Sequence, residues 1–315
     1  MGAPNNRTLK LGELEQAALA SRLIRPGPLP GVEGLSDQLL CGDAIKLIPQ
    51  LPAGIADLII VDPPYNLSRT FGATEFRESS TDVYAVWIRT WLPGLRRLLK
   101  DDGSLYVCAD WRCSGVIQRE LESTFHIQNR ITWEREKGRG AKANWKNASE
   151  DIWFCTADPD RYYFDLESVK LRRKVIAPYR KGGQPKDWEQ TERGNFRRTH
   201  PSNLWTDLTV PFWSMAENTE HPTQKPEKLI AKLILASSAP GALVFDPFLG
   251  SGTTAVVARK LGRKFLGIDR EESYLCLAAK RLALARVSPE IQGYSDGVFW
   301  ERNSTPPAGR RDAEG

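Results

Sequence analysis

The chain reads Leu243-Val-Phe-Asp-Pro-Phe-Leu-Gly-Ser-Gly252 where an apolar run gives way to a stretch with helical spacing. Because glycine has no side chain, Gly250 and Gly252 let the backbone turn tightly and come close to a ligand. The helix that begins beyond them presents its N-terminus to an anionic group. Neither the phosphate-loop pattern GxxxxGK[ST] nor a full GxGxxG pattern occurs here. This stretch therefore predicts a strand, a tight turn and a helix with a ligand at the turn.

An acidic residue stands at the end of the next apolar run. Asp269 follows residues 264–268, about twenty residues after the two glycines. In nucleoside-binding α/β folds, an acidic residue at this place accepts hydrogen bonds from a ribose. A Gly-x-Gly sequence alone is also typical of a plain tight turn, so it is Asp269 that favours a nucleoside cofactor.

Short apolar runs alternate with stretches of helical periodicity through most of the chain. The apolar runs cover residues 38–41, 56–61, 104–109, 243–245 and 264–268, and the helical stretches cover 83–100, 226–238, 253–261 and 274–285. Pro93 interrupts the first helical stretch and is expected to kink or split the helix. The alternation predicts an α/β fold with a doubly wound, mostly parallel sheet.

Length and composition narrow the class of protein. The 315 residues suit one α/β domain with a sizeable insertion, and 41% hydrophobic with 26% charged residues excludes a collagenous, coiled-coil or disordered chain. The sequence shows neither an apolar run of membrane-spanning length nor a signal-peptide pattern, which predicts a cytoplasmic protein without a membrane partner. The five cysteines lack CxxC spacing and there are three histidines, so we expect neither a disulfide framework nor a metal site.

A second motif, Asp62-Pro63-Pro64-Tyr65, follows the apolar run 56–61. Ligands of open α/β sheets bind beyond the carboxyl ends of the strands, which is where this motif falls. The two prolines stiffen the turn and fix the direction of the Asp62 carboxylate and the Pro63 carbonyl. Two acceptors beside an aromatic ring match an exocyclic amino group on a planar ring. The alternative interpretation is a proline-rich turn in which Asp62 serves as a cap.

The positive charge of the chain is concentrated between the two motifs. Residues 170–198 hold ten basic and three acidic side chains, a net charge of +7, which leaves −2 for the rest of a chain whose net charge is +5. Trp188 and Phe196 lie within this stretch, and Trp205, Phe212 and Trp213 follow it. Basic and aromatic side chains together suit a phosphate backbone and exposed bases, whereas the alternative is a solvated surface.

With these motifs in place, the chain resembles the DNA methyltransferases that methylate amino groups using S-adenosylmethionine. Asp62-Pro-Pro-Tyr65 resembles their catalytic motif, and Asp246-Pro-Phe-Leu-Gly-Ser-Gly252 resembles their cofactor loop. Because the catalytic motif comes first, the order is that of the circularly permuted β class. His221-Pro-Thr-Gln-Lys-Pro226 is similar to a third block of the class, and Gly42-Asp43 is similar to the block that lines the adenine of the cofactor.

The resemblance covers residues 36–110 and 218–285 and implies a Rossmann-like core with an inserted target-recognition region. Together with composition, which sets apart both ends of the chain, it predicts an N-terminal extension (1–35), a catalytic half of the core (36–134), a basic target-recognition insertion (135–215), a cofactor-binding half (216–301) and a disordered tail (302–315). The basic stretch falls inside the expected target-recognition region, which turns its interpretation toward DNA binding.

The resemblance also assigns roles to residues. In the catalytic motif, Asp62 and the Pro63 carbonyl accept the hydrogens of an amine on an extruded base, and Tyr65 stacks on that base next to Pro64. For the cofactor, Asp43 binds the adenine, Asp269 the ribose, Gly250 and Gly252 the methionine portion, and Thr223 and Lys225 its carboxylate, with Asp246, Phe248, Ser251 and Thr253 completing the loop. The residues expected to contact DNA are Arg172, Arg173, Lys174, Arg197 and Arg198. His221 is expected to be structural, and the polar residues 68–80 are expected to form a mobile lid.

An aspartate at the first motif position favours adenine N6 as the target, with cytosine N4 as the alternative on the same scaffold. A nicotinamide-dependent dehydrogenase explains the glycine loop but neither the Asp-Pro-Pro-Tyr motif nor the basic stretch, and a non-catalytic DNA-binding module leaves the cofactor loop without a role. Double-stranded DNA is the implied partner in a prokaryotic nucleoid. A cognate restriction endonuclease and a homodimer are left open.

Overall fold

A computed structural model describes residues 6–25, 27, 29–71, 74–135, 144–176, 179–191 and 194–302. Its central sheet has the strand order β1 (Gln38–Cys41), β15 (Lys264–Asp269), β14 (Leu243–Asp246), β2 (Ala56–Val61), β5 (Leu99–Ala109), β7 (Ser149–Thr156), β6 (His126–Glu134) and β13 (Leu204–Trp205). The first five strands are parallel, and β7 runs antiparallel to both β5 and β6. The predicted α/β fold with a mostly parallel sheet is confirmed.

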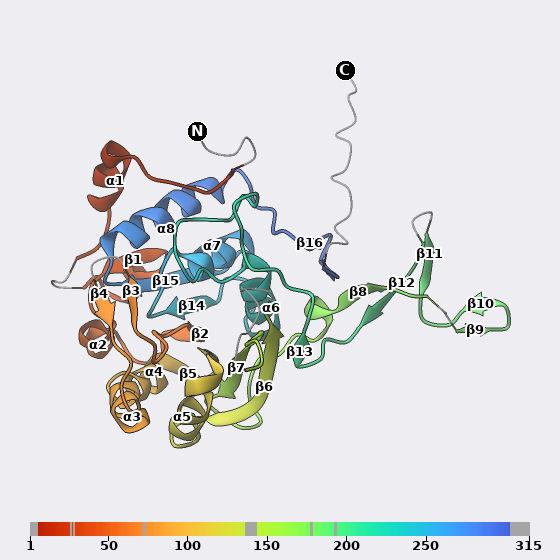
Figure 1. Cartoon of the computed structure of the whole chain (residues 1–315), viewed down its shortest axis with the longest axis horizontal. Helices are drawn as coiled ribbons and strands as arrows, with labels where there is room; N and C mark the ends of the chain where they lie inside the picture. Colours follow the sequence, from red (N-terminus) through yellow and green to blue (C-terminus); the bar gives the residue numbers. More distant parts are fainter. Residues whose placement is uncertain are drawn as a thin grey trace.

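Helices cover both faces of this sheet (Figure 1). One face is covered by α1 (Glu13–Ala20), α6 (Glu227–Ser237), α7 (Thr253–Lys260) and α8 (Glu272–Leu284), and the other by α2 (Ala44–Leu47), α3 (Thr81–Arg89), α4 (Leu92–Leu98) and α5 (Trp111–Glu122). Each set of helices buries its apolar side chains against the strands, which gives one hydrophobic cluster on each face. This three-layer arrangement is the doubly wound architecture.

The helical stretch that contains Pro93 is split, as predicted. Helix α3 begins behind Ser80, whose hydroxyl accepts a hydrogen bond from the Val83 N–H at 3.3 Å, and α4 begins at Leu92. Between them, Trp91 leaves the helical conformation (φ −124°). Pro93 therefore falls in the first turn of α4, where its missing N–H costs no hydrogen bond.

The carboxyl ends of the five parallel strands meet at one edge of the sheet. In each case an aspartate finishes the strand or follows it by one or two residues. These residues are Asp43, Asp62, Asp110, Asp246 and Asp269. The fold thus brings five carboxyl groups from distant parts of the sequence to one place.

The region expected as an insertion from 135 to 215 begins later than predicted. Strand β7 lies inside that range, but it pairs with β5 and β6 in the central sheet. Its apolar residues, among them the fully buried Ile152 and Cys155, complete the core on both faces. An antiparallel strand of this kind does not follow a helix, so the strand–helix alternation used for the prediction did not reveal it.

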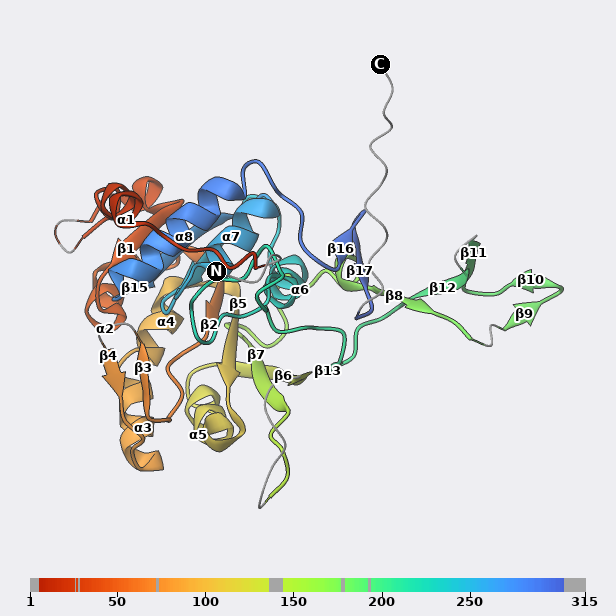
Figure 2. The same ribbon diagram turned by 45° about the horizontal axis from the view of Figure 1, so that its top comes forward.

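A second, five-stranded sheet holds most of the basic stretch. Its order is β11 (Glu189–Thr191), β12 (Gly194–Thr199), β8 (Leu171–Lys174), β17 (Val298–Trp300) and β16 (Tyr294–Ser295), and we call it the insertion sheet. It projects from the core beside α6, with the small hairpin of β9 (Arg180–Lys181) and β10 (Gln184–Pro185) farther out (Figures 1 and 2). The C-terminal strands β16 and β17 thus join this sheet, although the prediction placed residues up to 301 in the cofactor half. Phe299 is fully buried and pairs with Leu171, so burial of this apolar segment accounts for the difference.

The remaining elements are short. They are the 3₁₀ turns Val32–Leu35, Ile48–Gln50 and Glu167–Val169 and the hairpin of β3 (Arg69–Phe71) and β4 (Thr74–Phe76). The N-terminal extension is attached to the core, because Glu15 of α1 pairs with Lys280 of α8 at 2.7 Å. Within the described part of the chain, no helix has the length and apolar character needed to cross a membrane. The predicted tail 302–315 lies outside the described residues, apart from Arg302.

Candidate active site

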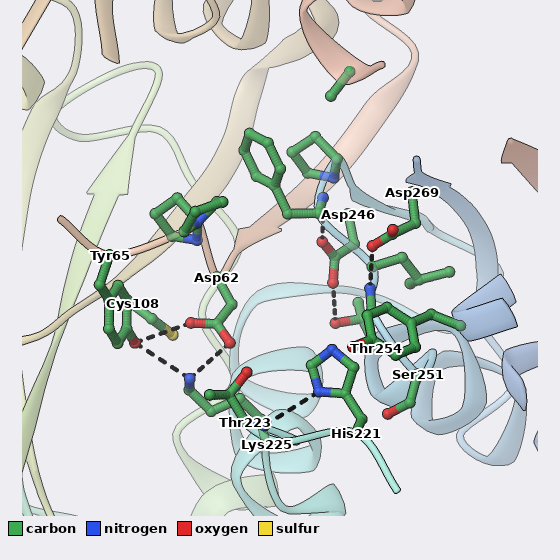
Figure 3. A pocket seen from close by; sticks show the side chains of 18 of the residues that line it. Asp62, Tyr65, Cys108, His221, Thr223, Lys225, Asp246, Ser251, Thr254 and Asp269 are labelled. Atoms are coloured by element: carbon green, nitrogen blue, oxygen red, sulfur yellow. Dashed lines mark hydrogen bonds and ion pairs between the residues drawn. The ribbon is translucent and has the colours of Figure 1, made fainter. Parts of the chain in front are cut away.

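A pocket at the carboxyl edge of the parallel strands brings the two sequence motifs together. Its cavity measures about 250 Å³, and the cofactor loop and the catalytic motif form opposite walls (Figure 3). Every residue that the sequence assigned to catalysis or to the cofactor lines this cavity, except Gly252. Two motifs about 180 residues apart in the chain therefore face one space, as the sequence predicted.

Asp246 stabilises the cofactor loop through two hydrogen bonds. Its carboxylate accepts hydrogen bonds from the Phe248 N–H at 3.0 Å and from the Thr254 hydroxyl at 2.6 Å. Burial raises the pKa of Asp246 to about 7. Both oxygens are thus engaged within the protein, so this carboxyl group holds the turn between β14 and α7.

The glycines of the loop are required by geometry. Gly252 precedes α7 with φ +85°, and a Cβ there would lie 2.4 Å from the Ala278 Cβ. Gly250 has φ +54°, and a Cβ there would lie 2.9 Å from His221 Nε2. A side chain at either position would clash with a neighbour and adopt a disfavoured backbone conformation. Gly252 therefore acts by packing α7 against α8 rather than by facing the cavity.

Asp269 lies next to the loop at the end of β15. One oxygen accepts the Gly250 N–H at 2.7 Å, and the other accepts the Glu271 N–H at 2.8 Å. Burial raises the pKa of Asp269 to about 6. The carboxylate is thus fixed at the rim of the cavity, where the remaining lone pairs of its oxygens can accept hydroxyl groups of a ligand.

Asp43 lies at the same edge of the sheet, just after β1, the strand that pairs with β15. It caps α2 by accepting the Ile45 N–H at 3.0 Å, and its other oxygen pairs with Arg270 at 3.0 Å. Asp43 and Arg270 both line the cavity. The expected contact of Asp43 with an adenine ring stays a prediction.

His221 belongs to the wall between the two motifs. Its Nδ1 accepts the Thr223 N–H at 3.3 Å, and its ring meets Tyr274 edge to face with centroids 4.4 Å apart. Burial, aided by the nearby cation of Lys225, lowers the pKa of His221 to about 3. The imidazole is therefore neutral, which agrees with the structural role expected for it.

The catalytic motif is held from both sides. The Tyr84 hydroxyl of α3 donates to the Pro64 carbonyl at 3.0 Å. The side-chain amide of Asn66 binds the backbone N–H and the backbone carbonyl of Ser79 at 2.9 and 2.7 Å. These contacts attach the motif to α3 and to the segment that leads into it. Pro63, whose carbonyl is the expected second acceptor, also lines the cavity.

Both oxygens of Asp62 have donors. The Tyr65 hydroxyl donates to one oxygen at 2.9 Å, and the Lys225 ammonium donates to the other at 2.7 Å (Figure 3). Burial, together with the neighbouring carboxylates, raises the pKa of Tyr65 well above its ordinary value, so its hydroxyl stays protonated. Lys225 Nζ also lies 3.2 Å from the Tyr65 oxygen.

The position of Lys225 differs from the sequence prediction. The resemblance assigned it to the carboxylate of a cofactor, but its ammonium lies among the catalytic groups, 3.4 Å from Glu150 Oε2 as well as against Asp62. Burial opposes the charge, yet the two carboxylates raise the pKa of Lys225 above its ordinary value. Lys225 directly precedes Pro226, the N-cap of α6, and its side chain reaches Asp62 from that helix start.

Several residues of the site carry no signal in the sequence. Glu150 lies on β7 and is ion-paired with Arg135, which directly follows β6. Glu150 Oε2 lies 3.2 Å from the Tyr65 hydroxyl oxygen and is a second acceptor for its one hydrogen, in place of Asp62. Trp87 of α3 also lines the cavity and packs against Phe248 with centroids 6.0 Å apart. These residues belong to no motif, so nothing in the sequence alone connected them to the pocket.

The expected lid is partly described. Residues 68–80 include the hairpin of β3 and β4, and Arg69 and Phe76 from it line the cavity. Residues 72 and 73 at its turn lie outside the described residues. The hairpin therefore borders the pocket, and its mobility stays a prediction.

The predicted DNA-contacting residues fall into two groups. Arg172 packs against the rings of Phe196 and Trp300, each 5.0 Å from its guanidinium carbon, and pairs with Glu189. The other four predicted residues, Arg173, Lys174, Arg197 and Arg198, are exposed on the insertion sheet. Arg173 lies 3.6 Å from Glu301, and Arg197 lies 3.2 Å from Asp187, both in weakly buried pairs. Arg172 thus has a packing role that the sequence did not predict, whereas the other four can reach a partner.

Comparison with known proteins gives a consistent picture. The family described as DNA methylase matches residues 56–280. Type II methyltransferase M.HpaI from Haemophilus parainfluenzae is 33% identical over 250 residues, which cover 79% of this chain and 74% of that protein. The DNA adenine methyltransferase YhdJ from Escherichia coli (strain K12) is also 33% identical, over 254 residues that cover 78% of this chain and 83% of the relative.

Solved structures share the fold at lower identity. M1.HpyAVI in complex with SAM is 24% identical with a TM-score of 0.53, and the match covers 78% of this chain and 98% of that chain. The cytosine-N4-specific PvuII DNA methyltransferase is 19% identical with a TM-score of 0.55, and the match covers 78% of this chain and 85% of that one. At these identities the likeness supports the Rossmann-like fold.

Proposed function

This chain belongs to the DNA methylase family, and we propose that it transfers a methyl group from S-adenosylmethionine to the exocyclic N6 amine of adenine in duplex DNA. The observation that carries the proposal is the shared pocket, in which Asp62 and Pro63 face the cofactor loop. An amine acceptor pair and a nucleoside site in one cavity suit the transfer of a group between the two ligands.

The pocket fits S-adenosylmethionine by the chemistry of its donors and acceptors. Asp269 offers fixed carboxylate oxygens to a ribose. The absence of a side chain at Gly250 keeps open the space between the loop and His221. Asp43 and Phe248 line the part of the cavity that we assign to the adenine. The hydroxyl groups in the wall, where we place the methionine portion, come from Thr223, Ser251 and Thr253.

When bound, S-adenosylmethionine supplies an electrophilic methyl group on a positively charged sulfur. The residues of the chain then prepare the amine. Asp62 and the Pro63 carbonyl accept its two hydrogens, which directs the nitrogen lone pair away from the base plane and toward the methyl group. Holding the two reactants in line removes much of the entropic cost of the reaction.

The base must leave the duplex to reach this pocket, at a cost of a few kcal/mol. We assign the stacking of the extruded base to Tyr65, whose ring borders the cavity and whose hydroxyl oxygen lies 2.9 Å from Asp62 and 3.2 Å from Glu150. After transfer the nitrogen carries a positive charge and an excess proton. Asp62 is the carboxylate placed to accept that proton.

Two features support adenine as the target. The first motif position is Asp62, and the relative YhdJ is named a DNA adenine methyltransferase at 33% identity. Cytosine N4 presents the same amine geometry, and it is the second candidate because the family includes both chemistries.

We assign DNA binding to exposed basic residues of the insertion sheet, namely Arg173, Lys174, Arg197 and Arg198. This sheet projects beside the core and carries much of the basic stretch (Figure 2). Guanidinium and ammonium groups on such a surface neutralise phosphates and release counterions. A cognate endonuclease belongs to the same proposal, because M.HpaI is named a type II methyltransferase. A cytoplasmic, nucleoid-associated location follows from the DNA substrate.

The proposal is tested by methyl transfer from S-adenosylmethionine labelled in its methyl group to unmodified bacterial genomic duplex DNA. We expect label in the DNA that depends on active protein and on an unmethylated substrate. Calorimetry with S-adenosylmethionine accompanies the assay. Binding of the cofactor without any transfer of label to DNA would contradict the proposed function.

A further inference from the structure

We propose that Glu150 is a positioning residue that takes the Lys225 ammonium and the Tyr65 hydroxyl from Asp62 when the target amine arrives. This inference rests on the proposed function. Both transferred groups already lie near Glu150, with Nζ at 3.4 Å and the hydroxyl oxygen at 3.2 Å from its Oε2. The exchange therefore requires only small side-chain movements.

The benefit of an exchange follows from the contacts of Asp62. Lys225 donates to one of its oxygens and Tyr65 donates to the other. Each oxygen keeps a second lone pair that can accept the amine. Both donors draw negative charge from the carboxylate, however, so weakening either contact makes Asp62 a stronger acceptor for the amine.

Lys225 cannot simply lose its partner, because its side chain is only 8% exposed. An unpaired ammonium at such a position is strongly disfavoured. Glu150 supplies a second carboxylate from a separate element, since it lies on β7. The ammonium thus stays paired throughout the exchange.

Glu150 is well suited to remain fixed while the other groups move. Its side chain is 2% exposed, and its second oxygen is ion-paired with Arg135. Because the Glu150 carboxylate is anchored, it can accept the Lys225 ammonium without moving. A mobile carboxylate would instead move with the ammonium toward Asp62. Arg135 therefore supports the position of Glu150, because its guanidinium donates to the Glu150 oxygen that faces away from Lys225.

The test compares Glu150→Gln with the parent in single-turnover methyl transfer to the same duplex DNA. The neutral amide keeps the shape but leaves Lys225 attached to Asp62, so we expect the rate to fall roughly 10- to 100-fold. We expect the dissociation constants for S-adenosylmethionine and for DNA to stay within about twofold, because Glu150 binds neither. Such a loss in rate without a loss in binding is not expected from a purely structural defect.

The same substitution in a Lys225→Met background tests the route of the effect. If Glu150 acts through the ammonium, most of the loss disappears when the ammonium is already gone. Equal losses in the two backgrounds would overturn the proposal. A Glu150→Gln rate within about twofold of the parent would overturn it as well, since electrostatic groups of this kind have larger effects.

Glu120→Gln is the matched control. The Glu120 side chain is 5% exposed and paired with Arg89 and Arg119, but it does not line the pocket. We expect it to lower thermal stability and leave the single-turnover rate unchanged. If Glu150→Gln does not fold, Glu150→Asp keeps the charge and shortens its reach; an unchanged rate in that variant contradicts the proposal, and a reduced rate supports it. A parent protein that methylates no DNA would instead contradict the proposed function, and this inference would fall with it.

Discussion

The pocket and the insertion sheet use charged residues in opposite ways. In the pocket, Asp62, Asp246 and Asp269 each have both oxygens engaged by protein donors at 2.6–3.0 Å. On the insertion sheet, Arg173 and Arg197 are about half exposed, and their acidic neighbours lie 3.6 and 3.2 Å away. One region holds its charges in fixed directions, and the other presents them to solvent.

This difference matches the two tasks that we propose for these regions. Methyl transfer requires acceptors within hydrogen-bond distance of one amine, and groups that are already oriented need no reorganisation during the reaction. A phosphate backbone is neutralised by long side chains that adapt to it. Substitutions in the pocket should therefore abolish methyl transfer. Substitutions on the insertion sheet should instead change how strongly DNA binding depends on salt concentration.

The largest effect is expected from Asp62→Ala. Loss of the amine acceptor should lower the methyl-transfer rate by about 10³-fold or more, because positioning and proton acceptance both disappear. Cofactor binding should be retained, since Asp269 and the glycine loop form the opposite wall. Calorimetry with S-adenosylmethionine and a single-turnover assay measure the two properties. A variant with near-normal turnover would show that Asp62 is not the acceptor.

Gly252→Ala should lower the stability of the protein without removing a group that contacts a ligand. The new Cβ would lie 2.4 Å from Ala278 at a φ of +85°, so we expect a loss of about 2–4 kcal/mol in the free energy of unfolding. Gly54→Ala is the control, because it shares a positive φ (+63°) but has no atom within 4 Å of the added Cβ. Denaturant unfolding of both variants measures the contribution of the α7–α8 contact. Equal losses would mean that packing at Gly252 contributes nothing.

Asp269→Ala should weaken cofactor binding by about 1.5–3 kcal/mol, the value of hydrogen bonds to a charged group. DNA binding without cofactor should change little, because the insertion sheet is separate from β15 (Figure 1). Calorimetry and fluorescence anisotropy measure the two affinities. An unchanged cofactor dissociation constant in a folded variant excludes the ribose contact.

The same residue predicts a pH dependence. Burial raises the pKa of Asp269 to about 6, and only the deprotonated carboxylate can accept all of its hydrogen bonds. Affinity for S-adenosylmethionine should therefore be full well above this pKa and fall as the pH drops through about 6. Calorimetry across this pH range tests the prediction, with Asp269→Asn as the control in which the decline becomes smaller. A parent affinity that rises as the solution is acidified would have the wrong sign.

The smallest effect is expected on the insertion sheet. Replacing Arg197 and Arg198 by Ala should reduce the magnitude of the log–log salt slope of DNA binding by about 0.9 for each phosphate that is no longer neutralised. Cofactor affinity should not change. Arg172→Ala sharpens the comparison, because its guanidinium packs against two rings. Its removal should lower the free energy of unfolding and leave the salt slope nearly unchanged. A double variant with the parent slope would show that Arg197 and Arg198 do not bind phosphates.

The sequence predicted those parts of the molecule that are local in the chain. The parallel strands, the split at Pro93 and the two motifs at the carboxyl edge each depend on neighbouring residues, and the structure confirms them. The pairing of β17 with β8 and the position of β7 depend on contacts between distant segments. A strand without an adjacent helix gives no alternation signal, so these could not be predicted.

The same reason explains what was missed in the site. Asp62 was found because prolines and an aromatic residue surround it in sequence, but its partner Lys225 is 163 residues away and Glu150 belongs to no motif. The charge of Arg172 predicts DNA binding, although its guanidinium already packs against Phe196 and Trp300. Charge counts identify a basic region, and only the three-dimensional contacts show which of its members are already engaged.

The central claim is that this pocket methylates adenine at N6, and mass spectrometry of nucleosides tests it most directly. Duplex DNA is incubated with the protein and S-adenosylmethionine carrying a labelled methyl group, then digested completely and analysed. The account predicts labelled N6-methyldeoxyadenosine that is absent with Asp62→Ala. Label found in N4-methyldeoxycytidine instead, or in no nucleoside at all, would contradict it.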